Sequence, residues 1–382
     1  MKIFIYKKNN LIGKPGGAEK VMCNMANYFA DQGHEVTLVT RDTNSGKPFV
    51  ELNKKVNFLQ LKIDFSKIKR GIGKMLASVG LIHKFPSFDR ELLVSNILKD
   101  TTSNIKPDII ILTGLAELTD FTYKQNTQIP IIVTFHSIPS IYLNTSKRKL
   151  KLYKEGLNKV AVCQVLLPSF EKILRSYYNG KIEVIGNVVA LQDFKRDYVN
   201  SNNTIVYLAR IEPNKQQDLL IESFSQIATN YPQWKIEFFG EIHNKKYYQK
   251  CLNLVKKYNL EKNIEFKGIT KSPIEKLKEA SICAFPSKFE GFSLSLTEAM
   301  SCGLPCIAFQ NCSGVNELIQ HSKNGLLAEN IDDFAVKLKN LMDDWELHKK
   351  IGEAAQESMK DYSPNVIWKK WSSLVNNTVE VI

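Results

Sequence analysis

The sequence lacks the long apolar runs that mark membrane-spanning and secreted segments. No stretch of its 382 residues approaches the roughly 18 consecutive apolar residues that a transmembrane helix needs. Residues 1–10 form a short apolar run that lysines soon interrupt, which is unlike a secretory signal peptide. We therefore expect a cytoplasmic protein.

Patterns that hold metals are also missing. The seven cysteines are scattered without a Cys-x-x-Cys pair, and the closest group, Cys302, Cys306 and Cys312, has no neighbouring histidine to complete a zinc set. Neither Asp-x-Asp nor His-Glu-x-x-His occurs. We expect reduced, mostly buried thiols, no bound metal and no cofactor.

Several motifs of catalysis and nucleic-acid binding are absent as well. Without Gly-x-Ser-x-Gly, a Ser-His-Asp hydrolase has no support. No Gly-x-Gly-x-x-Gly occurs either. The sequence shows no helix-turn-helix, zinc-finger or aromatic RNP-like pattern, so we expect no nucleic-acid partner.

Positive charge is present in excess, and it is concentrated in the first half. Residues 1–190 hold 28 Lys and Arg against 15 Asp and Glu, whereas residues 191–382 hold 24 of each. The whole net charge of +13 therefore belongs to the first half. A cationic half favours an anionic partner, such as a phospholipid surface or a phosphate-containing polymer. The alternative is an ordinary set of solvated lysines.

The alternation of elements predicts an α/β protein. A strand at Lys2 to Tyr6, a loop ending in Gly16-Gly17, a helix at Ala18 to Gln32 and a strand at Glu35 to Thr40 form a βαβ unit. Such a unit has a right-handed crossover and parallel strands. The polar segment Asp193 to Asn203 is typical of a linker. After it the alternation restarts, which predicts a second parallel domain with a ligand-binding cleft between the two.

The length also favours two domains. Further strands are predicted at 56–63, 108–112, 131–135, 160–167, 204–209, 235–239, 264–267, 282–285 and 305–309. Further helices are predicted at 92–102, 171–178, 217–228, 247–258, 273–280, 314–319 and 331–342. The expected division is an N-terminal domain at 1–190, a C-terminal domain at 191–364 and a last helical segment at 365–382.

Two segments of the first half are rich in basic residues. Phe65 to Arg90 mixes lysines and arginines with apolar residues, as an interfacial membrane helix does. An ordinary amphipathic helix and loop is the alternative. Ser146 to Lys159 adds a second basic run. Together these segments predict contact with an anionic membrane surface.

The segment Ser287 to Met300 is the one around which the rest of the chain is interpreted. Glu290 and Glu298 are separated by seven residues, and a helix is predicted to begin near Ser295, with Glu298 in its first turn. A helix N-terminus offers backbone N–H groups and partial positive charge to an anion such as phosphate. Carboxylates beside it could accept hydrogen bonds from sugar hydroxyls. The alternative is that Glu298 only complements the helix dipole and that Glu290 is a solvated charge in a loop.

Three more residues follow predicted strands at the end where ligands of parallel sheets bind. Arg210 ends the first strand of the second domain, and Lys215 comes just before a helix; both suit a phosphate. A salt bridge between Arg210 and Glu212 is the alternative. His136 follows a buried strand, and there a structural hydrogen-bonding role is the alternative to a catalytic one.

These motifs together resemble the family 4 glycosyltransferases. The resemblance rests on Gly16-Gly17-Ala18-Glu19, on His136, on LARIEPNKQQDLLIESF around Arg210 and Lys215, and on Glu290-x7-Glu298. It runs along nearly the whole chain, with the motifs in the expected order. Departures are Ala209 before Arg210, where glycine is frequent, and Val188 after Asn187. The resemblance implies the GT-B fold, with two Rossmann-like domains facing across a cleft.

The resemblance also implies a role for each residue. Glu290 and His136 would be the catalytic residues. The donor diphosphate would be bound by Gly16, Gly17, Arg210, Lys215, Leu294 and Ser295. The donor sugar would be bound by Glu290, Gly291, Phe292 and Ser293, the ribose by Glu298 and the base by Ile269.

The implied activity is a retaining, metal-independent transfer of a sugar from a nucleotide-sugar, expected to be UDP-linked. The acceptor would be a glycan or glycolipid, either lipid-linked or an anionic surface glycan. We expect a cytoplasmic enzyme, peripheral on the inner face of the membrane. Two alternatives remain: a non-catalytic protein that binds nucleotide-sugars or glycans, and a nucleotide-sugar epimerase of the same fold.

Overall fold

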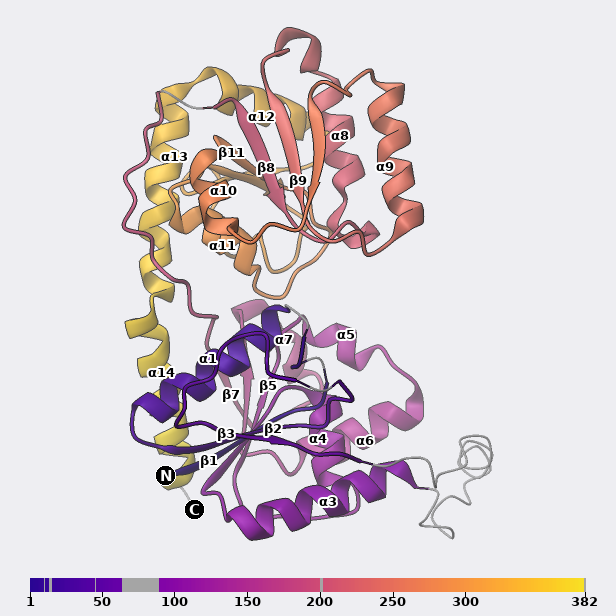
Figure 1. Ribbon diagram of the computed structural model, residues 1–382, viewed down its shortest axis with the longest axis vertical. Helices are drawn as coiled ribbons and strands as arrows, with labels where there is room; N and C mark the ends of the chain where they lie inside the picture. Colours follow the sequence, from indigo (N-terminus) through magenta and orange to yellow (C-terminus); the bar gives the residue numbers. More distant parts are fainter. Residues whose placement is uncertain (10, 14–15, 45, 64–88, 200–201, 381–382) are drawn as a thin grey trace. The chain divides into compact units, whose positions relative to one another are not determined.

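The computed structural model describes residues 1–9, 11–13, 16–44, 46–63, 89–199 and 202–380. The chain divides into two compact units (Figure 1). The first comprises Met1–Gly186 with Trp368–Ile382, and the second comprises Asn187–Ile367. The sequence placed the division at 190/191 and the last segment from 365. The basic segment Phe65 to Arg90 lies almost wholly outside the described residues.

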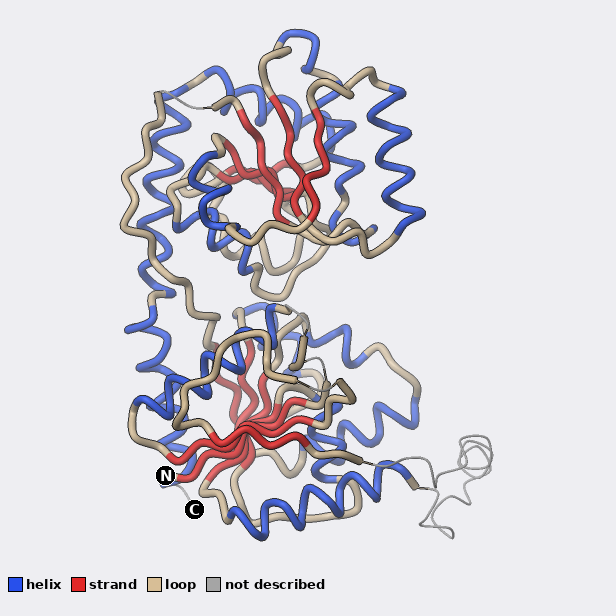
Figure 2. Tube along the Cα trace, viewed as in Figure 1, coloured by secondary structure: helices blue, strands red, loops and turns tan. Residues whose placement is uncertain are grey.

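The first unit is built on a seven-stranded parallel sheet (Figure 2). Its strands, in spatial order, are β3 (Asn57–Gln60), β2 (Glu35–Thr40), β1 (Lys2–Lys7), β4 (Ile109–Leu112), β5 (Ile131–Thr134), β6 (Val162–Val165) and β7 (Lys181–Val184). The central strands β4, β5 and β6 are buried along their whole length. Continuous apolar runs suit a parallel sheet because helices cover both of its faces.

Helices connect these strands. They are α1 (Gly17–Asp31), α3 (Arg90–Ile105), α4 (Leu115–Thr122), α5 (Pro139–Leu143), α6 (Lys147–Leu157) and α7 (Pro168–Arg175). The predicted C-terminal helix forms α14 (Pro364–Glu380). From Trp368 onward α14 belongs to the first unit, where the Trp368 ring stacks on Tyr28 with centroids 4.6 Å apart. Tyr28 Oη also lies 3.0 Å from Ser372 Oγ.

The second unit repeats the plan with six parallel strands. In spatial order they are β10 (Ile264–Gly268), β9 (Lys235–Phe239), β8 (Thr204–Leu208), β11 (Ile282–Phe285), β12 (Cys306–Phe309) and β13 (Leu326–Ala328). Its helices are the short η3 (Pro213–Lys215), α8 (Gln217–Ser225), η4 (Ala228–Asn230), α9 (Lys245–Lys257), α10 (Pro273–Glu279), α11 (Leu294–Ser301), α12 (Ile331–Asp343), α13 (Trp345–Ser358) and η5 (Met359–Tyr362). The predicted α/β class with two Rossmann-like parallel-sheet domains is confirmed.

One predicted helix is wrong. Residues 314–319 form turns, not a helix, and Gly314 has φ +87°. A residue in this left-handed region cannot continue a right-handed helix. Among the described residues, every helix is too short or too polar to span a bilayer.

Both sheets have the same topology, with the first and fourth strands of each unit side by side at the centre. These neighbours are β1 and β4 in the first unit, and β8 and β11 in the second. The strand order reverses direction there, and ligands of open α/β sheets bind at this switch point, beyond the carboxyl ends of the strands. The side chains that follow these four strands therefore define where to look for a site.

Candidate functional site

The switch point of the second unit lies beside the N-terminus of α11. This helix begins at Leu294, and Ser293 is its N-cap, with the Ser293 hydroxyl accepting the Leu296 N–H at 3.4 Å. The N–H groups of Leu294 and Ser295 have no partner within the helix, as at any helix start. Glu298 is the fifth residue of α11, so its predicted place in the first turn is wrong. The predicted phosphate-binding N–H groups are nevertheless at the helix start.

Lys215 and Glu290 come together at this switch point. Lys215 Nζ lies 2.6 Å from Glu290 Oε1, and the two side chains are only 14% and 12% exposed. Ser287 donates a hydrogen bond to the same oxygen at 2.6 Å. Sequence reasoning gave the two residues separate roles, whereas the structure makes them partners.

Backbone contacts hold the loop of Lys215 against the loop of Glu290. The N–H of Lys288 donates to the carbonyl of Asn214 at 2.9 Å, and the Asn214 amide donates to the carbonyl of Phe289 at 3.1 Å. The N–H of Glu290 donates to the carbonyl of Ser313 at 2.8 Å. Glu290 is therefore fixed on two sides before any ligand arrives.

Arg210 lies at the same end of the sheet but is differently engaged. Its guanidinium forms a salt bridge with Glu212 at 2.8 Å, and its side chain is 53% exposed. The bridge that the sequence left open as an alternative is thus present. A half-exposed pair of this kind is weak and can exchange partners. Arg210 remains a predicted diphosphate ligand, able to leave Glu212 for a more highly charged partner.

The other predicted residues of the second unit differ in how far they are buried. Phe292 is buried, and its ring packs edge-on against Tyr362 with centroids 5.0 Å apart, so it anchors the segment between Glu290 and α11. Gly291 precedes it in the chain. Ile269 follows β10 and is 69% exposed, a degree of exposure that leaves it available to a base.

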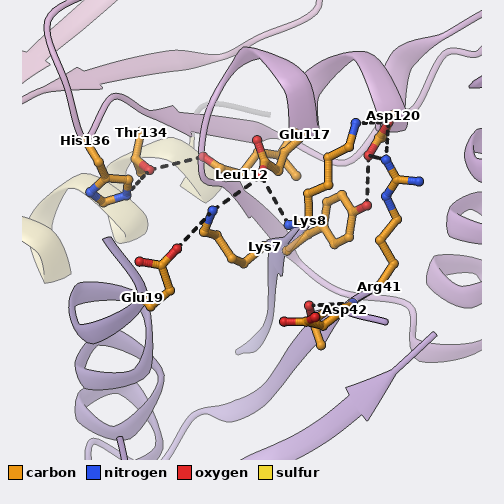
Figure 3. A network of polar contacts seen from close by, with 12 residues as sticks. Lys7, Lys8, Glu19, Arg41, Asp42, Leu112, Glu117, Asp120, Thr134 and His136 are labelled. Atoms are coloured by element: carbon orange, nitrogen blue, oxygen red, sulfur yellow. Dashed lines mark hydrogen bonds and ion pairs between the residues drawn. The ribbon is translucent and has the colours of Figure 1, made fainter. Parts of the chain in front are cut away.

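The switch point of the first unit carries a charge cluster that sequence reasoning missed (Figure 3). Lys7, the last residue of β1, lies between two carboxylates, with Nζ 3.5 Å from Glu19 Oε1 and 3.8 Å from Glu117 Oε1. Glu117 also accepts the N–H of Lys8 at 3.1 Å. All three charged side chains are largely buried.

The two glutamates occupy equivalent positions in their helices. Gly16 is the N-cap of α1 and Gly114 is the N-cap of α4, and each is followed three residues later by the glutamate. The sequence around both is Gly-x-Ala-Glu, a repeat that could have signalled Glu117. A carboxylate at the third helical position interacts favourably with the helix N-terminus.

The position of Glu19 affects the predicted binding of a diphosphate at Gly16-Gly17. A Cβ added to Gly16 would lie 2.0 Å from Glu19 Oε2, which shows how closely the carboxylate covers this turn. Two negative groups repel one another at a shared helix N-terminus. Gly16 and Gly17 remain predicted ligands, with the condition that Glu19 moves when a diphosphate binds.

His136 follows β5 in the same unit. Its Nε2 lies 2.9 Å from the Thr134 hydroxyl, which itself donates to the carbonyl of Leu112 at 3.2 Å. Thr134 has one proton, so Nε2 must be the donor to Thr134 and Nδ1 is the unprotonated nitrogen. Nδ1 is enclosed and has no hydrogen-bond partner among the described residues. Burial, with a smaller effect from the positive charge of Lys7, lowers the pKa of His136 to about 3.

A second network beside this cluster has a structural character. The buried Asp120 accepts from the Tyr6 hydroxyl at 2.9 Å and pairs with Lys8 at 3.0 Å and Arg41 at 3.2 Å. It ties the ends of β1 and β2 to α4. Burial raises the pKa of Asp120, and the positive charges of Lys8 and Arg41 oppose that shift.

Cysteines and metal ligands add nothing to these sites in the part of the chain that the structure describes. All seven cysteines are buried and free. No group of three His, Cys, Asp or Glu side chains has the arrangement of a metal site among the described residues.

Comparison with protein families gives two adjoining matches. Residues 189–358 match the family of glycosyl transferases of group 1. Residues 15–193 match glycosyltransferase family 4. Together the two matches extend over both units and include the predicted site residues.

Curated relatives from bacteria carry related names. An uncharacterized glycosyltransferase of Haemophilus influenzae is 28% identical, over 95% of this chain and 97% of its own. The amylovoran biosynthesis glycosyltransferase AmsD of Erwinia amylovora is 24% identical, over 96% of this chain and 97% of its own. The poly(ribitol-phosphate) alpha-N-acetylglucosaminyltransferase of Staphylococcus aureus is 30% identical, over 60% of this chain and 47% of its own.

Solved structures share the fold at low sequence identity. Sucrose-phosphate synthase from Thermosynechococcus elongatus superimposes with a TM-score of 0.80 at 18% identity, covering 100% of both chains. TarM of S. aureus, in a complex with fondaparinux, alpha-GlcNAc-glycerol and UDP, gives a TM-score of 0.77 at 19% identity, covering 98% of this chain and 99% of its own. These neighbours have the GT-B fold.

Proposed function

Because the chain belongs to the glycosyltransferases of group 1 and family 4, we propose that it moves a sugar from a UDP-linked donor to a hydroxyl of a surface-glycan acceptor. The observation that carries this proposal is the Lys215–Glu290 pair, 2.6 Å across, at the switch point of the second unit. The pair places a cation that can bind a phosphate in direct contact with a carboxylate that can accept hydrogen bonds from sugar hydroxyls.

The positive groups around this pair suit the departure of a diphosphate. Negative charge develops on the leaving phosphate as the sugar becomes oxocarbenium-like, and preorganised donors stabilise that charge. In the proposed complex Lys215 and Arg210 contact the diphosphate, together with the N–H groups of Leu294 and Ser295. Since these groups supply the positive charge, the proposed reaction proceeds without a metal.

The remaining contacts of the donor are proposed from the family resemblance. In the proposed complex Glu290 accepts hydrogen bonds from hydroxyls of the transferred sugar, beside the backbone of Gly291 to Ser293. Glu298, one turn into α11, binds the ribose, and the exposed Ile269 lies against the base. The name of the TarM complex includes UDP, and that likeness supports UDP as the nucleotide.

We propose that the transfer retains the configuration of the sugar. The bond from the anomeric carbon to the phosphate oxygen breaks, and a bond from that carbon to the acceptor oxygen forms on the same face. The acceptor's proton passes to the departing phosphate, so no protein base is required. His136 is neutral above about pH 3 and would contribute a hydrogen-bonding imidazole rather than a positive charge.

The acceptor is proposed to be anionic or carried by an anionic membrane. Support comes from the excess positive charge of the first half and from α6, where Lys147, Arg148, Lys149, Lys151 and Lys154 are exposed. The exposed Ile141 lies in the preceding helix, α5. The name of the S. aureus relative gives a poly(ribitol-phosphate) acceptor, and the phosphates of such a polymer are negatively charged. Peripheral attachment to the cytoplasmic face of the membrane fits the same surface.

A panel of nucleotide-sugars tests the donor assignment. UDP-, GDP- and ADP-linked sugars would be added with a chelator to the wild type and to Arg210→Ala, and the melting temperature recorded. A ligand that binds the native state raises its stability by mass action. We expect a UDP-sugar to raise the wild-type melting temperature most, with a smaller effect in the variant.

Sugar transfer to an added glycan acceptor separates an enzyme from a binding protein. Production of an α-linked product from an α-linked donor, seen by NMR, would establish retention. Stabilisation by a donor without any transfer or donor hydrolysis would favour the binding protein, and conversion of the donor sugar alone would favour an epimerase. A requirement for added Mg²⁺ or Mn²⁺ would contradict metal independence.

A further inference from the structure

A buried tyrosine hydroxyl contacts both loops that carry the Lys215–Glu290 pair. Tyr207 lies in β8, and Ser287 lies two residues beyond the end of the neighbouring strand β11. The side chains of Tyr207 and Ser287 have no exposed surface. Tyr207 Oη lies 3.1 Å from the carbonyl oxygen of Lys215 and 2.7 Å from Ser287 Oγ.

Ser287 extends this contact to the carboxylate. Its hydroxyl lies 2.6 Å from Glu290 Oε1, the oxygen that Lys215 Nζ also contacts at 2.6 Å. The contacts therefore close a ring: Lys215 backbone, Tyr207, Ser287, Glu290 and the Lys215 ammonium. Because the phenol belongs to a central strand, the ring fixes both loops to the rigid core of the sheet.

We propose that Tyr207 and Ser287 are positioning residues, whose hydroxyls set the geometry of Lys215 and Glu290 and let Glu290 exchange a protein hydrogen bond for one from the donor sugar. The proposal rests on the function proposed above and deepens it. Neither residue touches the donor; both act through the pair.

Counting protons shows how the exchange works. The three contacts that link the carbonyl of Lys215, Tyr207, Ser287 and Glu290 share two hydroxyl protons, because Tyr207 and Ser287 carry one each. In one arrangement Ser287 donates to Glu290, and Tyr207 donates to Ser287. In a second, Tyr207 donates to the carbonyl of Lys215 while Ser287 still donates to Glu290. In a third, Ser287 donates to Tyr207, and Tyr207 donates to the carbonyl of Lys215. In this last arrangement no proton lies between Ser287 Oγ and Glu290 Oε1, so the two oxygens move apart and make room for another donor.

The arrangement in which Ser287 donates to Tyr207 leaves Glu290 Oε1 with a free lone pair beside the ammonium. A hydroxyl of the donor sugar can then donate to that oxygen, and no buried hydroxyl is left without an acceptor. In a site closed to water an unmatched polar group is costly, so a switch that keeps both hydroxyls satisfied lowers the cost of binding. Removing either hydroxyl breaks the exchange.

Two variants test the proposal, Tyr207→Phe and Ser287→Ala. For each we expect kcat/KM for the UDP-sugar to fall about tenfold, the effect of one lost hydrogen bond to a charged or buried group. Since Ser287 acts on Glu290, which contacts only the sugar, Ser287→Ala should leave the affinity for UDP unchanged. Tyr207→Phe should weaken UDP as well, because Tyr207 also holds the Lys215 backbone. The double variant should lose no more than the worse single one.

Tyr247 provides a matched control. Its buried hydroxyl, also in the second unit, donates to Asp218, which pairs with Lys250. These three residues make no contact with Glu290 or Lys215 in the described structure. Tyr247→Phe removes a hydroxyl of the same kind and should leave kcat/KM within about twofold of wild type, as for a site away from the chemistry.

Hydrogen exchange gives a readout that needs no donor. Peptides spanning 210–217 and 286–296 should both exchange faster in Tyr207→Phe. In Ser287→Ala only the 286–296 peptide should exchange faster, and in Tyr247→Phe neither peptide should change. Equal exchange and equal kcat/KM in all three variants would overturn the positioning role, as would strictly additive losses in the double variant. If the wild type transfers no sugar at all, the proposed function fails. Hydrogen exchange of the two loops would then still show whether Tyr207 and Ser287 position them.

Discussion

Gly314 lies against the backbone of Glu290 so closely that no side chain fits between them. A Cβ added to Gly314 would stand 2.3 Å from the carbonyl oxygen of Glu290, and Gly314 has φ +87°. Real Cβ atoms do not approach backbone oxygen at that distance. The conformation of the Glu290 loop therefore depends on a glycine 24 positions further along the sequence.

Gly314→Ala is expected to displace Glu290 and to reduce turnover at least tenfold, since a loop shift misplaces a reacting group. Gly33→Ala is the control, because Gly33 has φ +84° and a Cβ there meets nothing within 4 Å. It carries the same backbone strain, about 1 kcal/mol, without a collision. Initial rates and urea unfolding would be measured for both. Equal activity in the two variants would show that the contact is unimportant.

Lys215→Met is expected to lower kcat/KM for the donor by about 100-fold, the scale found when one preorganised donor to a developing charge is removed. It also leaves Glu290, 12% exposed, without its cation. Lys288→Met is the control, as Lys288 is an exposed lysine of the neighbouring Glu290 loop. Steady-state rates without added metal would be compared. A loss below threefold in Lys215→Met would remove Lys215 from the diphosphate site.

Lys7→Met is expected to destabilise the first unit by about 2–3 kcal/mol, because it leaves Glu19 and Glu117 facing each other without their shared cation. Lys2→Met provides the comparison in the same strand. Lys2 pairs with Glu35 at 3.6 Å on the surface, and losing such a pair costs under about 1 kcal/mol. Urea titrations of the two variants would measure the difference. Similar losses would mean that the Lys7 cluster contributes no more than a surface pair.

His136 predicts a dependence of stability on pH. Its pKa falls from 6.5 to about 3 on folding. Below pH 6.5 the unfolded chain therefore binds a proton that the native state does not bind. The free energy of unfolding should therefore drop by up to about 1.4 kcal/mol per pH unit from this group, between pH 6.5 and about 3. His136→Gln removes that contribution. Its urea midpoint should fall less than the wild-type midpoint between pH 7 and 5, and parallel curves would contradict the assignment.

Reversing charge on α6 tests the membrane surface. A triple variant with Lys147, Arg148 and Lys151 changed to Glu should no longer float with vesicles of anionic lipid. Each basic residue near such a surface contributes about 1 kcal/mol to binding. The same reversal at Lys245, Lys256 and Lys257 of α9 matches the change in charge in the other unit. Equal flotation of both triple variants would exclude α6, and no flotation of wild type would exclude the membrane.

The sequence by itself determined the class of fold and most of its elements. Strands β2, β9 and β11 lie where the sequence predicted them, because short runs rich in β-branched and aromatic residues between polar turns suit strands. The start of α11 was predicted to within one residue. These features depend on neighbours in the chain, which a sequence displays directly.

Tertiary structure alone decided which of these residues meet. Lys215 and Glu290 are 75 positions apart, and they pair because the crossovers place β8 beside β11. The two Gly-x-Ala-Glu segments share Lys7 only because β1 and β4 are neighbours. Residue types indicate which chemical groups the chain can bring to a site. The order of strands in each sheet sets the distances, and no local pattern encodes that order.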